Sequence, residues 1–341
     1  GLTSKDIAKM TEEGLVGSFL HVVTAEEANA LQELALKSRL KIPLIIGIDA
    51  IHGNAMVSGC TVYPTNIGLA SAFDPAMIEK ISRQTALEMR ATGSHWTFNP
   101  NVEISRDPRW GRVGETFGED TYLVTKLGVA AVKGYQGADF TGTDKVLACV
   151  KHFMGGTPIN GTNGAPADLS ERTIREVYFP PYKAGIDAGA FTIMTAHNEV
   201  NGIPSHSSKW LMDDVLRKEW GFKGFVVSDW MDIEHIHDLH HTAESNKEAY
   251  FQSVDAGMDM HMHGPDFYYD VVALVKEGRI SEERINESCR RILEGKFKLG
   301  LFENRFVNLK DVKNNVFTKE HQATALEASR KSIVLLKNNG I

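Results

Sequence analysis

Cysteine is scarce in this chain of 341 residues, and its spacing excludes two kinds of site. Cys60, Cys149 and Cys289 are too few and too far apart for a disulfide framework or a C-x-x-C metal site. The histidines of the C-terminal third also lack the H-E-x-x-H spacing of a zinc site. These are His235, His237, His240, His241, His261 and His263. We therefore expect neither a bound metal nor another cofactor.

An excess of positive charge and a long apolar run are also missing. The formal net charge is -7, with no local Lys/Arg cluster, so nucleic acid is not an expected partner. No apolar run approaches the ~20 residues that span a bilayer, so no membrane partner is expected. The opening GLTSKDIAKM has neither the charged nor the apolar region of a signal peptide. That start fits a cytoplasmic protein or a trimmed one, and it leaves the compartment open.

Short apolar runs alternate with segments of helical period, and this alternation predicts parallel strands covered by helices. The expected strands are 16–20, 44–48, 96–99, 146–150, 191–195, 225–228 and a weaker 258–262. The expected helices are 25–39, 75–92, 121–135, 171–188, 208–220, 247–256 and 267–277. Strands recurring every ~30–50 residues favour an α/β fold of the TIM-like (β/α)8 type, incomplete or irregular at its start. A doubly wound sheet would need G-x-G-x-x-G after an early strand, and none follows 16–20 or 44–48.

The sequence changes character after Gly300. We expect residues 1–300 to form the barrel and residues 301–341 to be a connecting segment toward a second domain absent from this chain. In this segment 301–318 is polar and irregular, a helix begins near Lys319, and 332–336 is strand-like before KNNGI. The start also looks trimmed, because hardly any helix precedes the first strand.

Polar residues follow the predicted strands at the positions that converge on one mouth of a (β/α) barrel. They are Asp49 and His52 after the second strand, Lys151 and His152 after the fourth, His197 and Asn198 after the fifth, and Asp229 and Trp230 after the sixth. The loop after the third strand adds Glu103, Arg106, Asp107, Arg109, Arg112, Glu115, Glu119 and Asp120.

Several of these positions have plainer explanations. Asp229 would also suit the cap of the next helix. The adjacent Lys151 and His152 point to opposite sides of a regular strand, and they share one site only if the backbone is irregular, for instance at a cis peptide. Most arginines of RDPRWGR are expected to pair with carboxylates of their own loop, which leaves Arg112 to reach a substrate.

An acid at a strand end, an indole beside it and a ring of cations and carboxylates suit a sugar. Sugar sites combine charged hydrogen-bonding groups with aromatic platforms. Retaining glycoside hydrolysis needs a carboxylate nucleophile and a second carboxyl group roughly 5–5.5 Å away. Asp229 would be that nucleophile, kept ionised by positive partners. Asp49, Arg112, Lys151 and His152 would hold the sugar hydroxyls.

Six segments occur in an order that matches a known family: GIDAIHG, NVEISRDPRWGRVGETFGED, VKHF, MTAHNEVNGIPSH, LRKEWGFKGFVVSDW and GLF. From about residue 10 to the end, the chain resembles the first domain of family 3 glycoside hydrolases of the β-glucosidase type. The resemblance implies a TIM-like barrel, Asp229 as nucleophile and Trp230 as the aromatic residue beside the cleaved bond. It also implies Asp49 as the carboxylate deep in the pocket, with Arg112, Lys151 and His152 as its cationic partners.

Three departures limit what the resemblance implies. His197 stands where many members carry a tyrosine near the nucleophile, so its hydrogen bond to Asp229 is implied less strongly. The loop 154–168 lacks the Asp-x-His signature of the N-acetylglucosaminidase branch, which argues against that branch. In β-glucosidase-like members the acid/base glutamate comes from a second α/β domain that follows a segment like SIVLLKNNG. The acid/base is unknown here, because nothing in the spacing favours Glu103, Glu115, Glu119 or Glu171.

The hypothesis is a retaining, exo-acting β-glycosidase, with β-glucosidase preferred. It would release terminal non-reducing β-linked sugars from an oligosaccharide or β-glucoside through a covalent glycosyl-Asp intermediate, with the acid/base supplied by the missing domain. A β-xylosidase, an aldolase-like barrel with a Schiff base on Lys151, and a non-catalytic sugar-binding module are the alternatives. The resemblance slightly favours a periplasmic or secreted location. Sugar, linkage and oligomeric state stay open.

Overall fold

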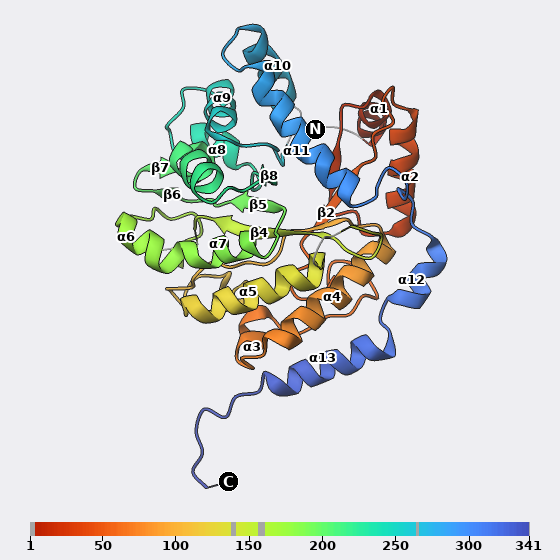
Figure 1. The fold of residues 1–341 in the computed structure, drawn as a ribbon, viewed down its shortest axis with the longest axis vertical. Helices are drawn as coiled ribbons and strands as arrows, with labels where there is room; N and C mark the ends of the chain where they lie inside the picture. Colours follow the sequence, from red (N-terminus) through yellow and green to blue (C-terminus); the bar gives the residue numbers. More distant parts are fainter. Residues whose placement is uncertain (1–3, 138–140, 156–160, 264–265, 341) are drawn as a thin grey trace. The chain divides into compact units, whose positions relative to one another are not determined.

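Parallel strands alternate with helices along the chain, and strand neighbours in sequence are neighbours in the sheet (Figure 1). The structure is a computed structural model that describes residues 4–137, 141–155, 161–263 and 266–340. The chain divides into two compact units. The first unit comprises Gly1–Pro100, Val129–Ala148 and Lys296–Ile341, and the second unit comprises Asn101–Gly128 and Cys149–Gly295.

The strand order is β1-β2-β3-β4-β5-β8, and every pairing is parallel. The strands are β1 (Ser18–Leu20), β2 (Ile45–Ile48), β3 (Trp96–Thr97), β4 (Leu147–Phe153), β5 (Thr192–Thr195) and β8 (Phe225–Val227). The start of β4 pairs with β3 in the first unit, and its continuation pairs with β5 in the second. A bridge from Val227 to Met260 continues the order. This sequential parallel order is that of a (β/α) barrel and has no reversal, unlike a doubly wound sheet.

Burial explains why the strands read as apolar runs. All residues of β2, β4, β5 and β8 are buried. A parallel sheet is covered by helices on its faces, so its strands need apolar residues without strict alternation. The short β6 (Glu199–Val200) and β7 (Ile203–Pro204) instead form an antiparallel pair in the second unit.

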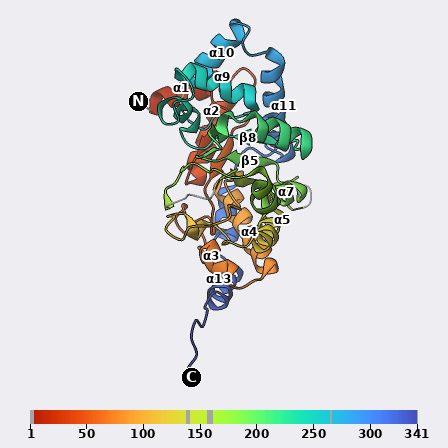
Figure 2. The same cartoon turned by 90° about the vertical axis from the view of Figure 1, so that its left-hand side faces the viewer.

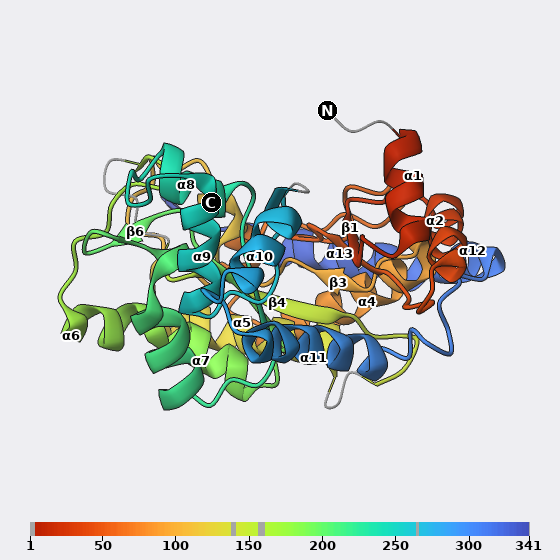
Figure 3. The ribbon, with the colours of Figure 1, turned by 90° about the horizontal axis from the view of Figure 1, so that it is seen from above.

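The described residues form helices of very different lengths. The α-helices are α1 (Ser4–Glu13), α2 (Ala25–Lys37), α3 (Asn66–Ala70), α4 (Pro75–Thr92), α5 (Thr121–Gln136), α6 (Glu171–Thr173), α7 (Phe179–Asp187), α8 (Asp232–Asp238), α9 (Asn246–Ala256), α10 (Asp266–Lys276), α11 (Glu282–Lys298), α12 (Leu309–Asn315) and α13 (Lys319–Lys331). Other helical turns are η1 (Val113–Glu115), η3 (Ile174–Tyr178), η4 (Ser205–Ser207) and η5 (Trp210–Glu219). In the first unit α1 packs against α2, and in the second unit α8 packs against α9 (Figure 3). No described helix has both the length and the apolar character to cross a bilayer.

Expectations near both ends of the chain differ from the structure. A helix, α1, precedes the first strand, where hardly any was expected. The segment 301–318 contains α12, which begins after the cap residue Asn308. Residues 332–336 are not a strand, because no described segment pairs with them, and four of their side chains are exposed.

The helix α13 is fastened to the first unit by a buried carboxylate. It lies beside α3 and α4 in both views of the ribbon (Figures 1 and 2). Glu88 of α4 accepts hydrogen bonds from His321 Nδ1 at 2.7 Å and from the Phe317 backbone N–H at 2.9 Å. Thr61 donates to the same carboxylate with its hydroxyl and its backbone N–H. Glu88 therefore joins three segments that are distant in sequence.

Candidate active site

Asp229 follows the buried end of β8 and does not cap the next helix. Residues Phe225–Val227 are fully buried, and the chain leaves the strand at Ser228. Helix α8 has Met231 as its N-cap residue, and that cap makes no side-chain hydrogen bond. Asp229 Oδ1 instead accepts from the backbone N–H of Trp230 at 2.7 Å. The capping alternative is therefore wrong, and the carboxylate is available for another role.

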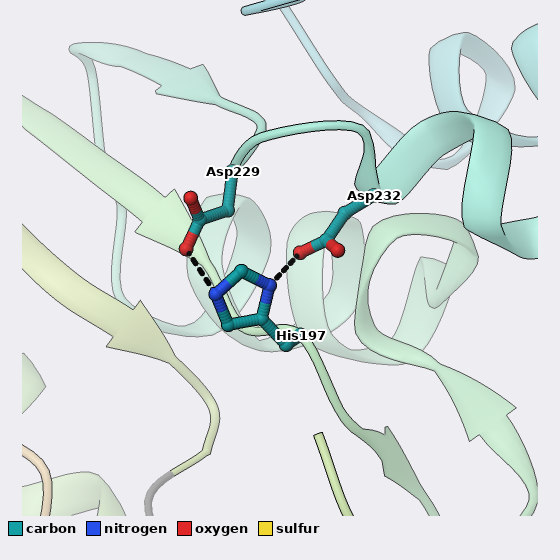
Figure 4. Close-up of side chains that lie close together, drawn as sticks. All are labelled: His197, Asp229 and Asp232. Carbon is teal, nitrogen blue, oxygen red and sulfur yellow. Dashed lines mark ion pairs between the residues drawn. The ribbon is translucent and has the colours of Figure 1, made fainter. Parts of the chain in front are cut away.

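His197 lies between two carboxylates (Figure 4). Its Nε2 is 2.9 Å from Asp229 Oδ2, and its Nδ1 is 2.7 Å from Asp232 Oδ2. Burial would lower the pKa of His197, but the hydrogen bonds to the two carboxylates outweigh it and raise that pKa to about 10. His197 is therefore an imidazolium at neutral pH.

The nucleophile candidate is held in its ionised form. Burial alone would raise the pKa of Asp229. The hydrogen bond from His197 and the positive charge of Lys151 outweigh burial and hold that pKa well below its usual range. A carboxylate in this state can attack an electrophile and cannot serve as a proton donor near neutral pH.

His152 is a neutral ring, which differs from the cationic role that the family resemblance implies. Arg112 Nη2 lies 3.0 Å from His152 Nε2, and a guanidinium only donates, so Nε2 must accept. The ring proton is then on Nδ1, which donates to Glu103 Oε2 at 2.8 Å. Burial lowers the pKa of His152, in agreement with this tautomer. The ring stacks on His197 at 5.9 Å, and Nε2 is 3.4 Å from Asp229 Oδ2.

His206, in η4, supports the backbone of Asp229. Its Nε2 accepts from the Asp229 backbone N–H at 3.0 Å. Burial lowers the pKa of His206 to about 4, so the ring is neutral and the accepting lone pair is present. The same nitrogen is 3.7 Å from Asp232, and it has no proton to donate there.

Lys151 is buried at the end of β4, and Trp230 is exposed. The peptide bond between Lys151 and His152 is cis, and the register of β4 against β5 shifts between Val150 and Phe153. The register shift shows that the backbone departs from the regular strand pattern between these two residues. The indole of Trp230 is 49% exposed, with an edge contact to His263 at 4.5 Å.

The arginines of the loop after β3 pair mainly with nearby carboxylates. Arg109 pairs with Asp107, and Arg112 holds Glu115 with two hydrogen bonds. Arg112 also contacts His152, so it belongs to the group around Asp229. Residues 156–160 of the loop 154–168 lie outside the described residues.

Asp49 and His52 lie in the first unit. Asp49 Oδ2 is 2.9 Å from His21 Nε2, and the ring of His52 contacts the Tyr63 carbonyl. Their part in a sugar site stays a prediction. In the second unit the structure brings together Asp229, His197, His152 and Arg112 from the predicted set.

The ligand atoms of His197, Asp229 and Asp232 lie within 4.8 Å of one another, which is close enough for a metal ion. A metal would need a lone pair on the imidazole. Here each ring nitrogen faces a carboxylate oxygen at hydrogen-bond distance, and both carry protons. The arrangement is therefore better described as an ion-paired triad than as a cation site.

Sequence reasoning missed Asp232 and His206, and it left Glu103 unassigned. Asp232 lies three residues after Asp229 in SDWMD. His206 is the last residue of the segment MTAHNEVNGIPSH. The sequence spacing does not indicate that Asp232 pairs with His197 or that His206 binds the Asp229 backbone. These contacts form only when β5 and β8 lie side by side.

The comparisons with known proteins show the family. The family model described as "Glycosyl hydrolase family 3 N terminal domain" matches residues 3–294. The "Periplasmic beta-glucosidase" of Salmonella typhimurium is 38% identical over 97% of this chain and 44% of the relative. The "Beta-xylosidase" of Formosa agariphila is 37% identical over 95% of this chain and 47% of the relative.

A crystal structure of β-glucosidase from Listeria innocua in complex with isofagomine superposes with a TM-score of 0.92 and 38% identity, over 99% of this chain and 47% of that one. The chain thus spans about half the length of the relatives it matches. The TIM-like α/β fold expected from the sequence is confirmed by this similarity. The chain belongs to glycosyl hydrolase family 3, whose N-terminal domain it contains.

Proposed function

We propose that this chain is the nucleophile-bearing part of a retaining, exo-acting β-glycosidase, and that β-glucosidase is its activity. The observation that carries the proposal is the ionised Asp229 at the end of β8, whose side chain is 13% exposed and pairs with the His197 imidazolium at 2.9 Å. The position, the charge state and the family all favour a carboxylate nucleophile.

The reaction takes two steps. An oxygen of Asp229 bonds to the anomeric carbon while the bond to the leaving oxygen breaks, and that oxygen takes a proton from an acid. Water then attacks the same carbon, gives its proton to the conjugate base, and releases the Asp229 carboxylate. Two inversions at one carbon retain the β configuration. The ion pair between His197 and Asp229 Oδ2 stabilises the carboxylate before the first step and as it departs in the second.

The acid/base is proposed to come from a second α/β domain. Asp229 cannot supply the proton, the buried Glu103 is bound to His152, and the partly buried Glu115 is bound to Arg112. The relatives extend well beyond the matched region, since the chain covers 44% of one and 47% of another. We accordingly assign the barrel to residues 1–300 and a connecting role to residues 301–341.

The sugar hydroxyls are assigned to Asp49, Arg112, Lys151 and His152, and the group beyond the cleaved bond to Trp230. The half-exposed indole of Trp230 suits an apolar sugar face or an aryl group. A β-xylosidase is the second candidate, because relatives with that name are as similar as those named β-glucosidase. The relative named periplasmic supports a periplasmic or secreted location.

Covalent trapping tests the nucleophile. A 2-deoxy-2-fluoroglucosyl fluoride carries its own leaving group, so it needs no acid and should esterify Asp229, as located by peptide mass spectrometry. The Asp229→Asn variant should take up no label, and Asp238→Asn, an exposed carboxylate on α8, should label normally. Labelling at another residue would refute the assignment. Sugar binding without label would favour the non-catalytic binding module.

Leaving-group dependence tests the origin of the acid. This chain should react with 2,4-dinitrophenyl β-glucoside, whose leaving group needs no proton, and only poorly with methyl β-glucoside. Equal efficiency on both substrates would overturn the proposal that the acid comes from another domain. Comparing 2,4-dinitrophenyl β-glucoside with the β-xyloside by kcat/KM distinguishes the two candidate sugars.

A further inference from the structure

The carboxylate of Asp232 is the least expected charge beside the nucleophile. Its side chain is only 3% exposed at the first position of α8, a helix in which Ile233, Glu234 and Ile236 are also buried. A buried carboxylate is costly unless it is paired and hydrogen-bonded. Of the two histidines within reach, His206 presents the nitrogen that already accepts from the Asp229 backbone. Of these two histidines, His197 is therefore the one that pairs with Asp232, at 2.7 Å from Nδ1 to Oδ2.

The two carboxylates together fix the protonation of His197. Each accepts hydrogen bonds and neither donates when ionised. Nε2 lies 2.9 Å from Asp229 Oδ2 and Nδ1 lies 2.7 Å from Asp232 Oδ2, so an anionic oxygen faces each ring nitrogen, and the two ion pairs favour the doubly protonated ring (Figure 4). The rings of His152 and His206, which also face this group, are neutral. Lys151 is a second positive charge that acts on Asp229, and the charge of His197 is the part that depends on Asp232.

We propose that Asp232 is a positioning residue for the nucleophile, which acts through His197 by holding its imidazole doubly protonated and ion-paired with Asp229 Oδ2. The inference rests on the proposed function for its catalytic consequence. The Asp232–His197 pair itself can be measured without any turnover.

Asp232 matters most when Asp229 is esterified. In the covalent intermediate Asp229 has lost its negative charge, and a histidine paired with that residue alone would tend to lose its proton. Asp232 keeps a counter-charge 2.7 Å from Nδ1 in both states of the nucleophile. The imidazolium is then still present to donate to the Asp229 carboxylate as water displaces it. The pair therefore serves the second step as much as the first.

A measurement on the ring tests the pair directly. In 15N spectra of the chain labelled at histidine, both nitrogens of His197 should remain protonated up to about pH 10. In Asp232→Asn, which keeps the shape and removes the charge, the His197 titration should move to lower pH by about one pH unit or more. A neutral His197 at pH 8 in the unmodified chain would overturn the proposal whether or not the chain is a glycosidase.

Kinetics test the consequence for catalysis. With 2,4-dinitrophenyl β-glucoside, Asp232→Asn should lower kcat by roughly tenfold to a hundredfold, since hydrogen bonds to charged groups have that effect, with little change in KM. The alkaline limb of the pH profile should move to lower pH with the His197 titration. The matched control is Asp238→Asn, which breaks the exposed His235–Asp238 pair on the same helix. This variant should change neither kcat nor the alkaline limb of the pH profile.

A double mutant separates positioning from a structural role. In a His197→Gln background, Asp232→Asn should have almost no further effect on kcat, because its route to the nucleophile is already gone. A full additional loss in that background would show that Asp232 acts on the fold and would overturn the proposal. If no variant and no unmodified chain reacts with the glucoside, the proposed function fails, and the 15N titration still decides whether the pair exists.

Discussion

Replacing Asp259 with asparagine should destabilise the strand that ends at the nucleophile. The side chain of Asp259 is fully buried. Its two oxygens accept from the guanidinium groups of Arg217, Arg284 and Arg291, the Ser288 hydroxyl and the Val226 backbone N–H. One carboxylate thereby joins β8 to η5 and α11. In Asp259→Asn the three arginines, each less than one-fifth exposed, lose the charge that they surround.

The expected loss follows from burial. Removing one partner of a buried ion pair costs about 3–5 kcal/mol, because the remaining charge is left uncompensated. Typical domains unfold with about 5–15 kcal/mol, so this is a large fraction of the total. With a urea dependence of about 3 kcal/mol per molar, the unfolding midpoint should fall by about 1 M or more. The matched control is Asp255→Asn, which breaks the half-exposed Lys209–Asp255 pair and should cost at most about 1 kcal/mol.

The stabilisation that Asp259 contributes should decrease as the pH falls. Burial would raise the pKa of Asp259, but the three arginines outweigh it and lower that pKa below its unfolded value. The stabilisation is therefore present above the unfolded pKa of about 3.9 and is lost as the pH falls through the folded pKa. Urea midpoints followed by circular dichroism between pH 7 and pH 3 measure both effects. Equal midpoints for the Asp259 and Asp255 variants at pH 7 would refute the reasoning.

Two further predictions concern buried carboxylates. Glu88→Ala should release α13 from α4 and speed hydrogen exchange in that helix, because His321 loses a buried partner worth about 3–5 kcal/mol. Burial would raise the pKa of Glu88, but hydrogen bonds from His321 and Thr61 outweigh it and lower that pKa. Acidification of the unmodified chain should therefore release α13 as well. Unchanged hydrogen exchange in Glu88→Ala would contradict this role. Glu103→Ala should leave the buried Nδ1–H of His152 unsatisfied at about 1–3 kcal/mol, and slow the labelling of Asp229 by a fluorosugar more than Glu103→Gln does. Equal labelling rates for the two Glu103 variants would show that this hydrogen bond does not position the ring.

The regular elements could be predicted closely where the sequence contains its own start and stop signals. Helix α4 begins and ends at the expected residues, since Asp74 caps it, Pro75 suits its first turn, and Gly93 adopts the positive φ at its end. Strand β4 instead extends beyond the predicted residue 150 to Phe153. The strand continues there through the polar residues Lys151 and His152. Buried strands were predicted from apolar runs, so polar residues inside a strand ended the prediction early.

Charges at the site were less predictable than positions. The carboxylate at 229 follows from a buried strand that ends in an acid, and the structure places it beside His197 and His152. Which of these histidines is charged depends on the partner at the second ring nitrogen. At His152 the partner is Arg112, whose guanidinium only donates and keeps the imidazole neutral. At His197 the partner is the Asp232 carboxylate, which favours the imidazolium.

The alternation of strands and helices, the family and the carboxylate that follows β8 can all be found along the sequence, because periodicity, capping and short motifs are local properties. Three features depend on the folded chain instead: His197 pairs with both Asp229 and Asp232, Arg112 holds His152 in its neutral form, and Asp259 binds β8 to three arginines. Protonation depends on burial and on distances of about 3 Å between segments far apart in sequence, and those distances exist only after β4, β5 and β8 have paired.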